Sequence, residues 1–513
     1  MSSTEENNSQ SLPAVAAAPF NHPSADVLFV SADGVEFWLH RVILSLASPF
    51  FDDMFSTLPT SDIADIGEAI PVPEDSKVFD YMMRFCYPVH HAEHANTNIF
   101  GSSGDQFMLM TKALEASVKY ELQCSSKTLA SALTSWHGSV HGPELYPLFC
   151  RLNLEEDAQA AAECITHRPK AVANSRVFEQ TLNGAYWSFA MSKVTAAQYF
   201  RLLHYLRAPD AFSAFRLPNA PFVNPETRLI GQGLTNNSPE ATASLIASYL
   251  DDAESASTDV VMVSYDGFEL PAHTLILRLG SAAELLANQA ASDTFTSHVD
   301  DLSNTGALAL RPRIHIPLSG RILADLLSLC YNQTRWQDKI SLERVASCVE
   351  AASRFHITKA LDSLRRHVTT QTDGHPLAVY FIAEAQGWAA EAKAAAVVVA
   401  KKRLETQYTP EMEDVPAVLY HRLLHFCHRF TVVLHAIVQH HIAGWNYSDR
   451  RPMSTSDRLD AQTAHIVARD DAYQQELRQA ILKIDLEAGL PPSPPTVSYE
   501  PDDEDMLEPP NGA

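Results

Sequence analysis

The segment HHAEH is the part of this 513-residue sequence that most resembles a metal site. His90, His91, Glu93 and His94 lie close together, and imidazole and carboxylate groups are common zinc ligands. No further ligand follows at a defined spacing, and the segment falls within the polar stretch 88–105. We therefore favour a solvated, histidine-rich loop over a metal site.

A second set of histidines has the spacing of ligands on a helix. His421, His425 and His428 follow each other at i, i+4 and i+7, which places them on one helical face. An internal repeat, described below, tests this pattern, because the equivalent positions are not all metal-binding residues. Those positions hold Phe200, His204 and Arg207. The comparison favours packing and surface roles over zinc binding, and we expect no metal or cofactor.

Acid–base chemistry has an equally weak basis in the sequence. His40 lies near Asp33, and His273 lies near Asp266, but no Ser or Cys nucleophile recurs at a matching offset. The sequence has no glycine-rich phosphate loop, HExxH, GxSxG or paired-carboxylate motif. We predict no catalytic and no cofactor-binding residues, and therefore no enzyme.

The composition indicates which kinds of molecule the protein binds and in which cellular compartment it is found. The formal net charge of -24, from 38 basic and 62 acidic residues, opposes binding to nucleic acid. The seven cysteines form no CxxC pair, which is typical of a reducing compartment. The N-terminus lacks a basic signal region, and the longest apolar run, 394–400, is too short to span a membrane. We expect a soluble intracellular protein, cytoplasmic or nuclear, that binds neither nucleic acid nor membrane.

The chain repeats itself in order. Residues 26–55 align with residues 259–288 without a gap, and twelve of the thirty positions are identical. Three further blocks follow in the same order: 78–87 with 322–331, 114–122 with 349–357, and 199–206 with 420–427. The shared order indicates a tandem duplication covering roughly 24–209 and 257–430.

Each copy has the pattern of a mixed domain. Residues 26–31 and 35–39 predict two strands joined by a turn at Asp33-Gly34, and a helical pattern begins at His40. In the second copy, the capping box at 281–284 predicts a helix start. A short extended segment precedes the next helical block in each copy, at 70–72 and at 314–316. This order predicts an α+β fold, and the rest of each copy is expected to be helical.

These residues resemble the signature of the BTB/POZ family. The pattern D-V-x-F, then D-G, then F-x-x-H-R-x-x-L-x-x-x-S-x-x-F-x-x-M is carried by Asp26, Val27, Phe29, Asp33, Gly34, Phe37, His40, Arg41, Leu44, Ser48, Phe51 and Met54. Residues 114–120 resemble a late helix of the family. The second copy departs from the pattern at Thr274, Glu284 and Ala287. The resemblance implies that His40 begins the first helix, where its ring can bond nearby backbone.

The resemblance and the repeat together divide the chain into two BTB/POZ-like domains, each followed by an all-helical extension, with disordered termini. The predicted boundaries are 1–23 disordered, 24–135 first BTB/POZ-like domain, 136–209 helical extension, 210–237 linker, 238–370 second BTB/POZ-like domain with a preceding helix, 371–485 helical extension, and 486–513 a disordered, acidic, proline-rich tail. Ser493-Pro494 and the acidic residues of that tail predict either a docking segment or, as we favour, a solubilising one.

The family resemblance implies a protein-interaction scaffold that self-associates and binds other proteins. The alternative is a substrate adaptor for a cullin-type ubiquitin ligase, which the resemblance alone implies. A transcription regulator would need a DNA-binding module, and an enzyme of another type is less favoured still. Many aromatic residues follow the second strand, and they suggest an apolar binding surface. Its candidate residues are Leu46, Phe50, Phe51, Met54 and Phe55.

A second candidate interaction site lies before the second copy. Many BTB domains pair through a helix before their first strand, and residues 238–252 predict such a helix. Its apolar face is formed by Leu245, Ile246, Tyr249 and Leu250. Since residues 1–23 predict no such helix, we expect the two copies to pair within one chain, with 238–252 near their junction. The alternative is that this helix covers only its own domain.

Overall fold

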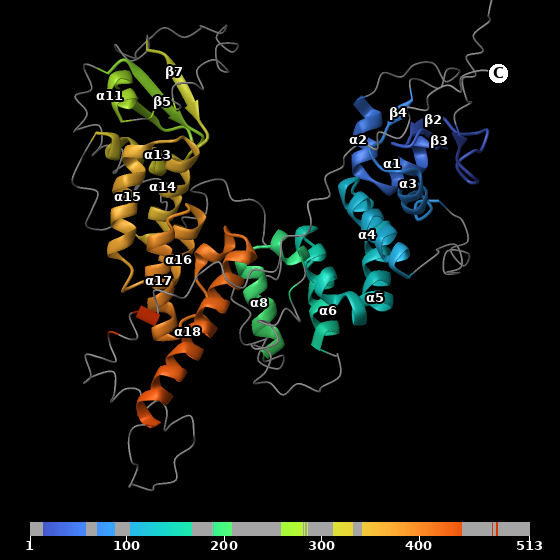
Figure 1. Ribbon diagram of the computed structural model, residues 1–513. Helices are drawn as coiled ribbons and strands as arrows, with labels where there is room; N and C mark the ends of the chain where they lie inside the picture. The colour runs from blue at the N-terminus through green and yellow to red at the C-terminus, as the bar shows by residue number, and fades with distance from the viewer. Residues whose placement is uncertain are drawn as a thin grey trace, which may run out of the picture. The chain divides into compact units, whose positions relative to one another are not determined.

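The computed structural model describes most of the two repeated regions. The described residues are 14–57, 69–87, 103–166, 187, 189–207, 258–280, 282, 285, 311–331, 341–443, 475, 479 and 480. They form two compact units, which are treated separately below (Figure 1). The first unit holds 1–177, 186–191 and 202–223, and the second holds 178–185, 192–201 and 224–513.

A four-stranded sheet forms one side of the first unit, in the order β1-β3-β2-β4. Its strands are β1 (Ala14–Val15), β2 (Val27–Val30), β3 (Val35–Leu39) and β4 (Ile70–Pro71). Strands β2 and β3 are antiparallel, and the turn between them needs Gly34, whose φ is +79°. Strand β4 pairs in parallel with β2. The hairpin and the later extended segment are therefore confirmed.

The N-terminal strand corrects one expectation. Residues 1–23 were predicted to be disordered, but β1 pairs in parallel with β3 and Phe20 is fully buried. The Phe20 ring packs edge-on against Tyr87. The prediction was wrong for residues 14–23 because so short an edge strand, flanked by prolines, has no alternating pattern to recognise.

Helices cover the sheet and continue beyond it in the first unit. They are α1 (Arg41–Ala47), α2 (Pro49–Thr57), α3 (Ser76–Met83), α4 (Ser103–Lys119), α5 (Gln123–Arg151) and α6 (Glu155–Thr166). Pro49 is the first residue of α2, a position that suits the fixed φ of proline. Helix α5 runs across the predicted boundary at 135/136, and its backbone is non-helical at His141.

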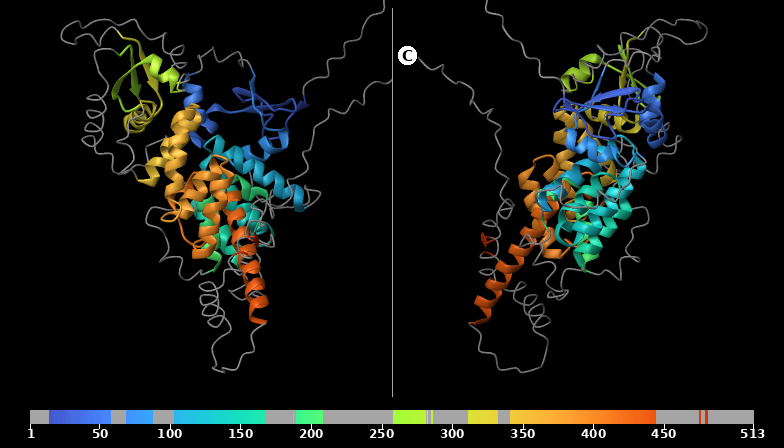
Figure 2. Two further views of the ribbon diagram at one scale, coloured as in Figure 1. Left: turned by 60° about the vertical axis from the view of Figure 1, so that its left-hand side comes forward. Right: turned by 90° about the vertical axis from the view of Figure 1, so that its right-hand side faces the viewer.

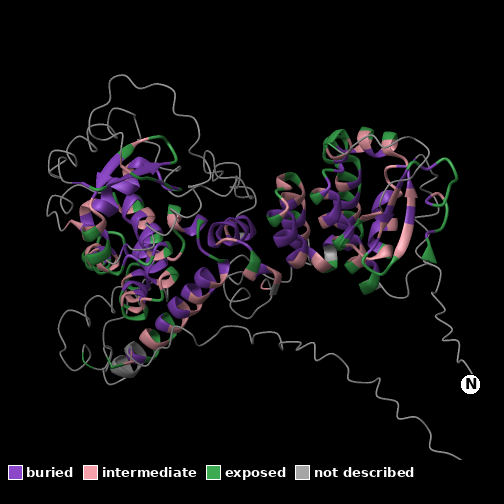
Figure 3. Ribbon diagram, turned by 90° about the horizontal axis from the view of Figure 1, so that it is seen from above, coloured by how far each residue is buried: buried purple, intermediate pink, exposed green. Residues whose placement is uncertain are grey.

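The second unit repeats the strand arrangement with three strands. These are β5 (Val260–Ser264), β6 (Glu269–Ala272) and β7 (Arg313–Ile316), in the order β6-β5-β7. Strands β5 and β6 are antiparallel, and β7 is parallel to β5. All five residues of β5 are buried, and Figure 3 shows buried residues along these strands.

In the second unit α11 (Thr274–Leu279) lies beside the sheet, and the later helices extend away from it (Figures 1 and 2). The later helices are α13 (Gly320–Cys330), α14 (Leu342–Arg354), α15 (Thr358–Thr370), α16 (Pro376–Ala385), α17 (Ala389–Lys402), η9 (Pro410–Glu413) and α18 (Ala417–Ala443). Two earlier elements, η4 (Phe189–Lys193) and α8 (Ala196–Arg207), are divided between the units. The helical character of both extensions is confirmed where residues are described.

Several predictions fall outside the described residues. They concern the loop 90–94, the linker 210–237, the helix 238–252, three of the four residues of the capping box 281–284, and the tail 486–513. Within the described ranges, no helix combines the length and apolar content that a membrane crossing requires.

Candidate functional site

Two backbone donors at the start of α1 are fixed by side chains from elsewhere in the first unit. The Arg41 N–H donates to Asp26 Oδ1 at 2.7 Å, and the His40 N–H donates to the Tyr87 hydroxyl at 2.9 Å. Both groups belong to the unpaired first turn of a helix, which needs such acceptors. Burial raises the pKa of Tyr87 to about 12, so this hydroxyl stays protonated. The two contacts fix where α1 leaves the sheet.

The His40 ring makes a different contact from the one that the resemblance implied. Its Nδ1 lies 3.2 Å from the Tyr87 hydroxyl, and its Nε2 lies 2.8 Å from Ser24 Oγ. One arrangement satisfies every group: Tyr87 donates to Nδ1, and Nε2–H donates to Ser24. The ring therefore bonds side-chain hydroxyls rather than local backbone. These contacts hold the start of α1 in place.

A third contact fixes the turn between β2 and β3. Asp33 accepts hydrogen bonds from the Ser31 hydroxyl at 2.6 Å and from the Ser76 N–H at 2.8 Å. These hydrogen bonds lower the pKa of the Asp33 carboxyl to about 2. The carboxylate therefore ties the hairpin turn to the start of α3.

The second unit contains the same three contacts at the aligned positions. The Thr274 N–H donates to Asp259 Oδ1 at 2.7 Å, and the His273 N–H donates to the Tyr331 hydroxyl at 2.8 Å. The Gly320 N–H donates to Asp266 Oδ1, also at 2.8 Å. The predicted equivalence of His40 and His273 is confirmed by these contacts.

With α1 fixed in this way, apolar side chains lie on its outer side. Val42 is 63% exposed and Leu46 is 85% exposed, and they lie one turn apart on α1. Phe50, at the start of α2, is 39% exposed. We call these three residues the α1 face. In the second unit, the aligned positions on α11 hold Leu275 and Leu279, which are 67% and 74% exposed. We call this pair the α11 face.

The other predicted surface residues divide between surface and core. Phe51 is fully buried, and its ring stacks on Tyr120 at a centroid distance of 5.4 Å. Met54 and Phe55 are half-buried, and Arg41 lies 5.5 Å from the centre of the Phe55 ring. Phe51 therefore belongs to the core and is left out of the surface. The other four candidates, Leu245, Ile246, Tyr249 and Leu250, lie outside the described residues.

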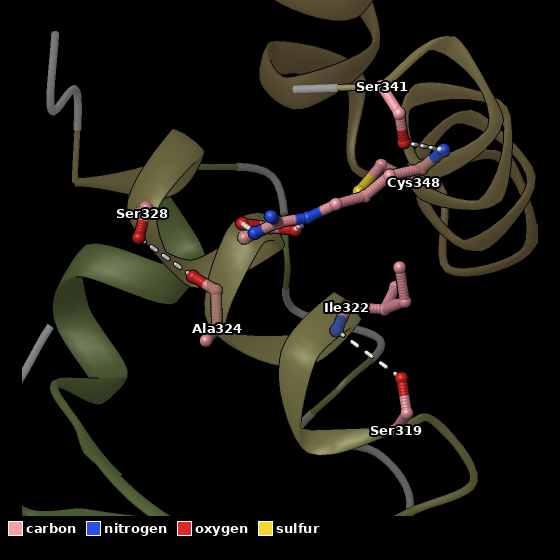
Figure 4. Close-up of polar contacts among 8 residues, drawn as sticks. Ser319, Ile322, Ala324, Ser328, Ser341 and Cys348 are labelled. Atoms are coloured by element: carbon pink, nitrogen blue, oxygen red, sulfur yellow. Dashed lines mark hydrogen bonds and ion pairs between the residues drawn. The ribbon is translucent and has the colours of Figure 1, made fainter. Parts of the chain in front are cut away.

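A buried ion pair joins α13 to α14 in the second unit, and Figure 4 shows polar contacts of this region, including the labelled Cys348. Arg344 on α14 makes two hydrogen bonds to Asp325 on α13, and Cys348 Sγ lies 3.8 Å from Asp325 Oδ2. Burial raises the pKa of the Cys348 thiol well above its usual value. A protonated, enclosed thiol is a poor nucleophile, so this cluster supports packing rather than chemistry.

The second histidine set also forms a buried contact. The Nε2 atoms of His421 and His425 lie 3.1 Å apart, and His421 Nδ1 lies 3.2 Å from the Tyr199 hydroxyl. Burial and the neighbouring His425 lower the pKa of His421 to about 3, so its ring is neutral. Among the described residues, no three His, Cys, Asp or Glu side chains gather as metal ligands.

The comparison with known families identifies the first unit. Residues 20–125 match the family model of the BTB/POZ domain. Residues 20–125 are thus similar to BTB/POZ domains, a class of domain that binds other proteins and self-associates. No curated protein matches the chain.

Two kinds of residue at this site were missed by sequence reasoning. The exposed residues Val42, Leu275 and Leu279 were not named, although they occupy aligned positions in the repeat. The tyrosines that bind the histidine N–H groups, Tyr87 and Tyr331, are identical and aligned. The alignment of the two copies could have identified both kinds of residue, because each aligned position holds the same type of residue, apolar or tyrosine, in both copies.

Proposed function

We propose that the chain is a non-enzymatic interaction scaffold that combines the BTB/POZ domain with a second BTB-like domain over 238–370. The second domain does not appear in the family match, which ends at residue 125. Its support is the shared strand order and the three shared polar contacts. An intracellular location, in the cytoplasm or the nucleus, belongs to the same proposal.

The observation that carries this function is the exposed α1 face. Exposed apolar side chains on one side of a helix and at the start of the next are typical of a protein-binding surface. The side chains cost free energy in water, and a partner that covers them removes this cost. The α11 face shows the same property at the aligned positions.

Affinity purification of the tagged full chain tests the function. Val42→Asp with Leu46→Asp should abolish recovery of proteins that the native chain retains, because charges oppose burial of the face. Both side chains are exposed, so the substitutions should leave the fold intact. Asp53→Asn, an exposed change on α2, serves as the control and should retain the partners. If the double variant retains them as well, the α1 face is not the binding surface.

The same experiment separates the scaffold from the cullin-adaptor alternative. Recovery of a cullin with the native chain but not with the double variant would establish the adaptor. Recovery of other proteins, without a cullin, would support the general scaffold.

Intramolecular pairing of the two domains is part of the proposal. Two modules on one chain meet at roughly millimolar effective concentration, which favours pairing within the chain. Leu245→Asp with Leu250→Asp should loosen the two halves in limited proteolysis, if 238–252 lies near their junction. Equal protection of the halves would contradict that role for the helix.

A further inference from the structure

A segment from the first half of the sequence belongs to the second compact unit. Residues 192–201 contain the end of η4 and the first turns of α8, and they group with residues 224–513. They pack against residues 410–422, which contain η9 and the first turns of α18. The contacts between these two segments come in pairs that the alignment of the segments relates to each other.

The two segments have the same sequence pattern. Residues 191–204 align with residues 412–425 at a constant offset of 221, and eight of the fourteen positions are identical. The aligned pair Thr195 and Pro416 face each other in an isolated antiparallel bridge. The two residues that are equivalent in the alignment are therefore also in contact with each other in the structure.

The backbone hydrogen bonds beside this bridge are exchanged by the alignment. The Ala196 N–H donates to the Val415 carbonyl, and the Ala417 N–H donates to the Val194 carbonyl. Both bonds are 2.8 Å long. Ala196 aligns with Ala417, and Val194 aligns with Val415. Replacing each residue by its aligned counterpart therefore turns one hydrogen bond into the other.

The aromatic rings obey the same rule. Tyr199 and Tyr420 are aligned, and their rings meet edge-on at 6.0 Å. Tyr199 lies 6.0 Å from the His421 ring at 57°, and Tyr420 lies 5.9 Å from the Phe200 ring at 56°. Because Phe200 aligns with His421, these two contacts are also images of each other. Reciprocal contacts of this kind define an interface with local two-fold symmetry.

One ion pair has no counterpart under the alignment, and it distinguishes the partner of the segment 192–201. Arg201 and Glu413 are both buried and form an ion pair across the interface. The reciprocal partner would be Ser192 for Arg422, but Arg422 pairs with Glu384 on α16 instead, at 2.6 Å. If two copies of the segment 192–201 from separate chains paired with each other, Arg201 would face Ser192, which has no carboxylate. The second-half segment is the better partner because it supplies Glu413.

We propose that these two segments form a dimer-type interface within a single chain, which anchors the end of the first half on the second unit. The partner that fits the surface of 410–422 is the related segment 192–201 of the same chain. The surface is thereby occupied and is not available to join separate chains. This inference rests on the reciprocal contacts and does not depend on the proposed scaffold function.

A cleavable full-length chain tests the interface. A site-specific protease recognition sequence inserted within 210–237 allows the native protein to be cut between the halves. We expect the two fragments to co-elute as a one-to-one complex with the mass of the intact chain. Light scattering of the uncut protein should give a single chain at low micromolar concentration.

Charge variants then identify the interface. In the cut protein, Arg201→Glu should weaken the association of the fragments at least tenfold, because it places two buried carboxylates together. Combining it with Glu413→Arg should restore association to within about threefold of the native value, as expected for a directly coupled pair.

A milder pair of variants covers the case in which Arg201→Glu does not fold. Tyr199→Phe removes the hydroxyl that contacts His421 across the interface. Tyr420→Phe removes a hydroxyl that donates to the Glu405 carbonyl within the second half. We expect about fivefold weaker fragment association for Tyr199→Phe, which is about one hydrogen bond. Tyr420→Phe should leave the association unchanged.

Three results would overturn the inference. The first is separation of the native fragments after cleavage. The second is equal association of the native, Tyr199→Phe and charge-reversed fragments. The third is a stable dimer of the uncut protein in which the two segments come from different chains, shown by a Glu413→Arg chain that pairs with an Arg201→Glu chain.

Discussion

The sheets of the two units share a strand order and three polar contacts, but they differ in the side chains that fill their cores. In the first unit the aligned core positions hold Phe29, Phe37 and Phe79, all nearly fully buried. In the second unit these positions hold Met262, Leu270 and Leu323, which are equally buried. The polar contacts fix the helix starts and turns in both units, whatever the core is made of. The family match covers residues 20–125, the region in which these core positions are aromatic.

A second difference lies in where each unit places its charges. In the first unit Arg84, just beyond α3, pairs with Asp80 one turn earlier, and both side chains are half-buried. In the second unit Arg344 pairs with Asp325 between two helices, with little exposure of either side chain. The aligned position of Asp325 in the first unit is Tyr81, so the buried charge belongs to the second unit.

Breaking the buried ion pair should give the largest effect. Arg344→Leu leaves the Asp325 carboxylate buried without its cation, and we expect a loss of about 3–5 kcal/mol in the free energy of unfolding. Arg84→Leu, the matched change at the half-buried pair of the first unit, should cost less, about 1 kcal/mol. Calorimetric unfolding of the full chain measures both. Equal effects would show that the two charge pairs do not differ as described.

The matched tyrosines should give the next largest effect, and it should be the same in both units. Tyr87→Phe and Tyr331→Phe each leave a histidine backbone N–H without its acceptor, at a cost of about 1–3 kcal/mol. Hydrogen exchange of α1 and α11, followed by mass spectrometry, would report local opening. An effect in one unit without the other would contradict a shared polar frame.

The histidine at the contact between the two segments should give a smaller, pH-dependent effect. The pKa of His421 is lowered from 6.5 to about 3, mainly by burial, so below pH 6.5 the unfolded chain binds a proton that the folded chain does not. The resulting loss of stability is absent above pH 6.5 and grows as the pH falls toward 3. Below pH 6 the slope should approach about 1.4 kcal/mol per pH unit for this residue. His421→Phe makes this segment resemble its counterpart, which has Phe200 at the aligned position.

Thermal unfolding between pH 8 and pH 5 would compare the native chain with the His421→Phe variant. The variant should be less stable at neutral pH, because Tyr199 loses a partner, but its stability should depend less on pH. An unchanged slope would show that His421 is not the group that titrates.

The strands and the first helix of each unit were predictable because alternating residues, a turn and two aligned copies all indicated them. The order of strands β2 and β3, and of β5 and β6, followed directly. Strand β1 was missed because a strand of two residues is too short to show the alternation of buried and exposed side chains. Phe51 was assigned to the surface because neighbouring aromatic residues at 50 and 51 look alike in sequence, whereas the helix turns one outward and the other inward.

The contact between 192–201 and 410–422 was beyond sequence reasoning for a different reason. Its residues are more than two hundred positions apart, and their similarity indicated duplication rather than contact. Only the fold brings the two equivalent segments together, through bonds such as that from the Ala196 N–H to the Val415 carbonyl.

The central claim is that the α1 face binds protein, and photo-crosslinking tests it most directly. A photoreactive amino acid replaces Leu46, the most exposed member of the face, in the full-length chain. A second chain carries the same group at Asp53, which is also exposed. The account predicts a specific protein adduct from position 46, lost when Val42 is changed to Asp, and none from position 53. Equal labelling from both positions, or an adduct that survives the Val42 change, would contradict it.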